Sequence, residues 1–162
     1  MRTFDLEEVK DFIRKQSPST KIYLGCDSSR YRDGNSWYAE YTTVIVVHID
    51  GHRGCKIFAE ITNEKDYDQK KNRPQIRLMN EVYKVSQMYQ QLVDVFFDRE
   101  VQIHLDINPD EKYGSNIVIN QAIGYVRGTC DGITPQVKPD ALAASYAADR
   151  WTEIRDLEYS KI

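Results

Sequence analysis

Residues 21–62 read KIYLGCDSSRYRDGNSWYAEYTTVIVVHIDGHRGCKIFAEIT, and this stretch carries three consecutive strand patterns. KIYLGC is typical of a short buried strand, WYAEYTTVIVVHI is dense in aromatic and β-branched residues, and CKIFAEIT alternates apolar with polar side chains. The polar segments RYRDGNS and DGHRG between them predict turns. The stretch therefore predicts three consecutive antiparallel strands.

The flanking sequence adds helices and further strands. A helix precedes residue 21, because Leu6, Val9 and Ile13 recur at helical spacing. The predicted order is helix, three strands, helix, strand, helix, strand and helix, which defines an α/β fold. The elements after residue 62 are a long helix from Pro74, a strand in VQIHLDI (101–107), a helix over 115–128, a short strand in DGITPQVKP (131–139) and a last helix from Pro139.

Length and composition favour one soluble domain over residues 1–162. The net charge of −3 argues against a protein that coats nucleic acid nonspecifically, because such binding depends on many Lys and Arg side chains. No apolar run is long enough to span a membrane, so we expect no membrane partner. The N-terminus MRTFDLEEVK lacks the pattern of a secretory signal, which favours the cytoplasm.

Three aspartates occupy comparable positions in the predicted fold. Asp27 follows the first strand, Asp106 ends the fourth, and Asp140 lies at the start of the last helix. If the first and fourth strands are parallel neighbours, Asp27 and Asp106 project at the same edge of the sheet, about 5 Å apart. Strand ends are where α/β sheets place their sites, so these acids are candidates for one site.

The long helix supplies a candidate fourth carboxylate, Glu81. At 100° per residue it lies about 60° from Leu78 and 40° from Val85, which places it beside the buried stripe of the helix. It would then reach the edge of the sheet. The alternative is an exposed glutamate paired with Arg77 or Lys84, and the residues leave both open.

A cluster of three or four carboxylates suits hydrolysis of phosphodiester bonds with two divalent ions. Two such ions lie about 3.5 to 4 Å apart, one activating water and the other stabilising the leaving oxygen. Mg²⁺ and Mn²⁺ prefer oxygen ligands, so a pair of either ion is the expected cofactor.

The blocks IYLGCDSS (22–29), VQIHLDINPDEKYGSN (101–116) and QVKPDALAASYAADRW (136–151) together resemble the YkuK family of bacterial and phage proteins in the ribonuclease H-like superfamily. The resemblance covers nearly the whole chain, and KPDALA is similar to the DALA segment of the RuvC-type resolvases. It implies a mixed five-stranded sheet, three antiparallel strands followed by parallel ones, with helices on both faces. It also implies a two-metal nuclease site at Asp27, Glu81, Asp106 and Asp140.

Other polar residues near these positions are candidates for substrate contacts. Lys138 would contact the scissile phosphate, and Ser28, Ser29 or Asn108 would orient substrate or water. The leading hypothesis is a metal-dependent nuclease, with RNA, DNA and hybrid substrates all open. A branched junction would require a homodimer presenting two sites. The alternative is a catalytically inactive module of the same fold that binds nucleic acid or a protein partner.

Aromatic side chains of the first hairpin have two interpretations. Tyr31, Trp37 and Tyr38 would stack on bases of a bound nucleic acid, or they form an ordinary tyrosine-rich β surface. Other enzyme classes fit less well: DSSRYRDG lacks the early glycine of an actin-like phosphate loop, and a GxSxG elbow is absent.

Overall fold

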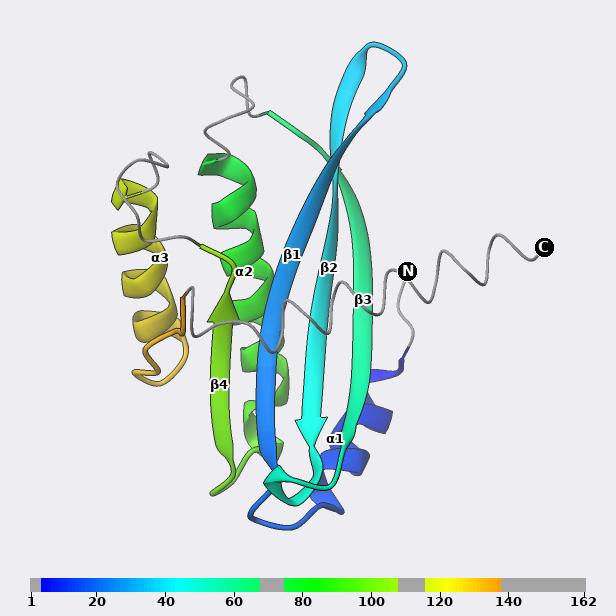
Figure 1. The fold of residues 1–162 in the computed structure, drawn as a ribbon, viewed down its shortest axis with the longest axis vertical. Helices are drawn as coiled ribbons and strands as arrows, with labels where there is room; N and C mark the ends of the chain where they lie inside the picture. The colour runs from blue at the N-terminus through cyan, green and yellow to red at the C-terminus, as the bar shows by residue number, and fades with distance from the viewer. Residues whose placement is uncertain (1–3, 68–74, 108–115, 138–162) are drawn as a thin grey trace, which may run out of the picture.

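The computed structural model describes residues 4–67, 75–107 and 116–137 (Figure 1). Through the third helix, the elements follow the predicted order. They are α1 (Leu6–Arg14), β1 (Lys21–Asp33), β2 (Ser36–His48), β3 (Cys55–Lys65), α2 (Gln75–Leu92), β4 (Glu100–Leu105) and α3 (Asn116–Thr129).

The sheet is mixed, with the strand order β3-β2-β1-β4. β1 is antiparallel to β2, β2 is antiparallel to β3, and β1 is parallel to β4. This confirms three antiparallel strands followed by a parallel one. Of the predicted fifth strand, the described residues form a single parallel bridge between Gln136 and His104, so four strands are shown.

The first hairpin is longer than predicted. RYRD, which the sequence places in a turn, continues β1 to Asp33, and the turn consists of Gly34 and Asn35. β2 holds this extension because pairing continues in register to Asp33 opposite Ser36. Gly34 has φ +61°, a conformation that favours glycine in a two-residue hairpin loop. Asp27 therefore lies inside a long strand, not at its end.

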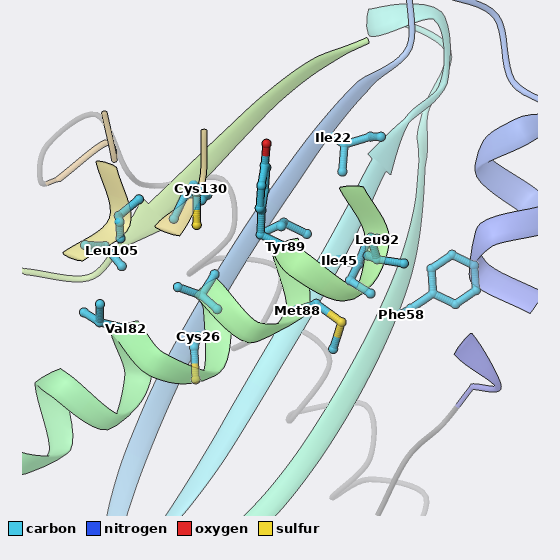
Figure 2. Packing of buried hydrophobic residues seen from close by; sticks show 14 of the residues in the cluster. Ile22, Cys26, Ile45, Phe58, Val82, Met88, Tyr89, Leu92, Leu105 and Cys130 are labelled. Carbon is cyan, nitrogen blue, oxygen red and sulfur yellow. The ribbon is translucent and has the colours of Figure 1, made fainter. Parts of the chain in front are cut away.

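The core lies between the sheet and the helices. α2 lies across β1 and β2, with Val82, Met88 and Leu92 facing Ile22 and Ile45 of the strands (Figure 2). α1 joins the same core at β3, and α3 joins it beside α2. The described helices therefore pack on one face of the sheet. The last predicted helix, from Pro139, lies outside the described residues, so helices on both faces remain a prediction.

In residues 4–67, 75–107 and 116–137, no helix is both long and apolar enough to cross a membrane. Asp5 is the N-cap of α1, and its carboxylate accepts a hydrogen bond from the Glu7 backbone N–H at 3.4 Å.

Candidate active site

Asp27 and Asp106 are brought together by the pairing of β1 with β4. The last pair of this parallel ladder is Cys26 with Leu105, so Asp27 is the next residue of β1 and Asp106 is the residue directly after β4. Adjacent strands lie about 4.8 Å apart. Both aspartates are half-buried. The predicted adjacency of the two strands is confirmed, and the meeting point is the place where β4 ends.

Glu81 approaches this point from α2. It is 5% exposed, so it belongs to the buried side of the helix, and the alternative of an exposed glutamate is wrong. The Ser28 hydroxyl on β1 donates a hydrogen bond to Glu81 Oε1 at 2.5 Å. Ser28 also donates its backbone N–H to Asp27 Oδ1 at 2.8 Å. One serine therefore contacts carboxylates from both the strand and the helix.

The electrostatics of Glu81 link the three carboxylates. Burial raises the pKa of Glu81 well above its ordinary value, and the Ser28 hydroxyl opposes this shift. The negative charges of Asp27 and Asp106 raise that pKa further, while the Arg77 guanidinium lowers it. Asp27, Asp106 and Glu81 thus share one electrostatic environment, which we call the carboxylate cluster.

A second buried acid, Asp66, adjoins the cluster and has no counterpart among the residues expected from the sequence. Its side chain is 0% exposed and forms ion pairs with Arg30 on β1 at 2.5 Å and with Arg77 on α2 at 3.9 Å. Arg77 lies one helical turn before Glu81. In the sequence, Asp66 stands in a polar segment that is indistinguishable from a solvated loop, so no local pattern identifies it.

The donor chemistry of the carboxylate cluster fits a hard divalent cation, because carboxylate and hydroxyl oxygens are the ligands that Mg²⁺ and Mn²⁺ prefer. Within residues 4–67, 75–107 and 116–137, no three His, Cys, Asp or Glu side chains are close enough together to hold one ion. Glu81 is instead engaged by Ser28. The cluster thus offers suitable donors without a preformed three-carboxylate ligand set in the described part of the chain.

The remaining candidates from the sequence divide into two groups. Ser29 is described and exposed, beside Ser28 on β1. Asp140, Lys138 and Asn108 lie outside the described residues.

A mixed sheet with this strand order, carrying carboxylates where β4 ends beside β1, defines an α/β protein with a polar site at the end of a parallel strand pair. A family model described as ribonuclease H-like matches residues 5–153. The chain belongs to the ribonuclease H-like family, which confirms the assignment drawn from its sequence blocks. No curated protein and no solved structure matches the chain.

Proposed function

We propose that this protein is a metal-dependent nuclease that hydrolyses phosphodiester bonds at the carboxylate cluster. The observation that carries the proposal is the buried Glu81, whose pKa is raised by burial and by Asp27 and Asp106. Buried acids surrounded by like charges are costly and occur preferentially at functional sites. Membership of the ribonuclease H-like family supports the same conclusion.

Some residues of the chain would hold the divalent ions, and others would orient the side chains that bind them. Asp27, Asp106 and Glu81 would hold divalent ions, with Asp140 as a proposed fourth ligand. Bound Mg²⁺ or Mn²⁺ would supply a water of lowered pKa and stabilise the leaving oxygen. Ser28 would orient Glu81, to which it already donates a hydrogen bond.

Asp66 lies outside the carboxylate cluster but helps to position Glu81. By pairing with both Arg30 and Arg77, it connects β1 to the first turns of α2. Glu81 lies on the next turn of the same helix, so the ion pairs help to fix its approach to β1. Asp66 is therefore proposed as a positioning residue.

The competing function is a catalytically inactive member of the family that binds nucleic acid or a protein partner. The hydrogen bond between Ser28 and Glu81, and the lack of a three-carboxylate ligand set among the described residues, favour it. Fold membership alone does not establish catalysis. This function predicts binding that survives removal of divalent ions.

The test is cleavage of a labelled panel of single-stranded DNA, duplex DNA, RNA, hybrid and junction substrates in Mg²⁺ and in Mn²⁺. We expect cleavage by the wild type and none by Asp106→Asn. Asp94→Asn is the matched control, because Asp94 is an exposed aspartate of the short segment after α2 and pairs with Lys10. It should cut as well as the wild type.

A second readout tests the ions without substrate. A ligand that binds only the folded state raises the unfolding temperature, so Mg²⁺ or Mn²⁺ should stabilise the wild type and Asp94→Asn more than Asp106→Asn. Equal stabilisation of all three proteins, together with no cleavage of any substrate, would contradict the nuclease proposal. A junction as the preferred substrate would also predict a dimer in solution.

A further inference from the structure

The hairpin formed by β1 and β2 projects beyond the helices and beyond the end of β3 (Figure 1). β3 pairs with β2 only as far as Lys65 opposite Tyr38, whereas β1 and β2 continue pairing to Asp33 opposite Ser36. We call the segment from Arg30 to Ala39 the arm.

One face of the arm carries an aromatic pair. Tyr31 lies directly opposite Tyr38, and their rings stack with centroids 5.7 Å apart and planes inclined by 21°. Tyr31 is 38% exposed. Its hydroxyl donates to Asn63 Oδ1 at 3.0 Å, which fixes the ring, and the exposed Lys65 is the register partner of Tyr38. We call Tyr31, Tyr38, Asn63 and Lys65 the tyrosine face.

The tyrosine face shares its side of β1 with one member of the carboxylate cluster, Asp27. Alternate residues of a strand point to the same side, so Asp27, Ser29 and Tyr31 share one side of β1. Four residues of strand span about 13 Å, roughly the length of four stacked nucleotides. Ser29, between them, is exposed. A nucleic acid strand bound at Asp27 would therefore be led directly onto the tyrosine pair.

The opposite side of the arm offers a different chemistry. There the Arg30 guanidinium lies 4.2 Å from the centroid of the Trp37 ring, and Arg30 is itself held by the buried Asp66. The guanidinium of Arg30, already paired with Asp66, occupies one face of the indole, although Trp37 is 39% exposed. The tyrosine pair is the aromatic surface that shares its side of β1 with Asp27, so we place the ligand there.

We propose that the tyrosine face binds unpaired bases of a single-stranded nucleic acid, and this proposal rests on the proposed function of the carboxylate cluster. Tyrosine rings stack on any base that is not already stacked, and such binding needs few cations. Duplex binding depends on many phosphate contacts, which a chain of net charge −3 is poorly equipped to make. Lys65, the exposed register partner of Tyr38, supplies local positive charge on the side of the rings.

The experiment measures binding in EDTA, where metal-dependent cleavage does not occur. Labelled oligonucleotides of about 12 nucleotides, within the site sizes of single-strand binding folds, are titrated with protein and followed by fluorescence anisotropy. Single strands and a duplex of the same sequence are compared. We expect the wild type to bind the single strands more tightly than the duplex, and Tyr31→Leu to weaken single-strand binding about tenfold, within the range measured at stacking platforms.

Two further variants distinguish the loss of base stacking from other effects of removing a tyrosine. Tyr31→Phe keeps the ring and loses the hydrogen bond to Asn63, so it should retain wild-type affinity. Tyr125→Leu removes an aromatic side chain of equal exposure, 39%, which packs on Tyr83 at a distance from the arm, and it should also bind normally. Wild-type affinity in Tyr31→Leu, or duplex binding as tight as single-strand binding, would overturn the proposal.

Failure of this inference and failure of the proposed function give different results. Single-strand binding that depends on Tyr31, without cleavage in Mg²⁺ or Mn²⁺, would retain the tyrosine face and reject the nuclease. Cleavage by Tyr31→Leu with the same KM as the wild type would retain the nuclease and reject binding at the tyrosine face.

Discussion

Glu81 and Asp66 are both buried carboxylates, but their neighbours carry opposite charge. Asp66 lies between two guanidinium groups, those of Arg30 and Arg77. Glu81 accepts a hydrogen bond from the Ser28 hydroxyl, and the negative charges of Asp27 and Asp106 act on it. The charge of a buried acid paired with cations is compensated, and breaking the pair leaves an uncompensated buried charge, whereas the charge of a buried acid among acids is opposed by its neighbours. The first arrangement supports the scaffold, and the second is typical of a site.

The largest expected difference concerns the stability of the scaffold. Asp66→Ala leaves Arg30 and Arg77, whose side chains are 15% and 16% exposed, without their shared partner. We expect the free energy of unfolding to fall by about 3 kcal/mol, the lower end of the range for a broken buried ion pair. Urea denaturation measures it.

Asp94→Ala is the matched control for this comparison. Its pair with Lys10 involves a side chain that is 57% exposed, so its loss should cost about 1 kcal/mol or less. Equal losses in Asp66→Ala and Asp94→Ala would contradict the structural role of the buried pair.

The second prediction concerns the hydrogen bond between Ser28 and Glu81. Ser28→Ala removes the donor, and an unsatisfied buried acceptor costs about 1 to 3 kcal/mol. The cost should be larger above the folded pKa of Glu81 than below it, because the ionised carboxylate needs the donor more than the protonated one does. Urea denaturation of Ser28→Ala and of the exposed neighbour Ser29→Ala, over a series of pH values upward from 4.5, measures it. A cost for Ser28→Ala that stays constant across the series would contradict the prediction.

The smallest effect, and the one with the clearest sign, is the pH dependence contributed by Glu81. Its pKa is raised in the folded protein, so between its ordinary value of 4.5 and its folded value the folded state binds the proton more tightly than the unfolded state. Wild-type stability therefore falls as pH rises through that window. Glu81→Gln does not titrate and escapes this loss.

Glu81→Gln should consequently be more stable than the wild type at neutral pH in EDTA, with an advantage that shrinks toward pH 4. Denaturation curves at several pH values measure the difference. A difference that stays constant across the series would show that Glu81 has no raised pKa in the folded protein.

The part of the site that depends on strand pairing could be predicted from the sequence. Val101, Ile103 and Leu105 alternate as expected for a strand, and this placed Asp106 beside Asp27. The helical angle of Glu81 indicated a position beside the buried stripe, but it could not distinguish burial from exposure. The structure shows that Glu81 is buried and accepts a hydrogen bond from Ser28, which lies 53 positions away in the chain.

The sequence failed where long-range pairing overrides local polarity. SSRYRD has the composition of a loop, but pairing with β2 makes it strand. Asp66 likewise reads as one acid in a charged segment, and only its pairing with Arg30 and Arg77 reveals its burial. Both errors arise because the partner that fixes the structure lies far away in the chain.

The early end of β4 also bears on the solubility of the protein. Beyond Cys26, β1 continues to Asp33 after β4 has stopped, so among the described strands it has a neighbour only on the β2 side. A long strand edge is a template for association with other chains, and charged side chains along it discourage such pairing. Arg32 and Asp33 lie on this stretch. This edge of β1 would be a starting point for aggregation if these charges were replaced by apolar residues.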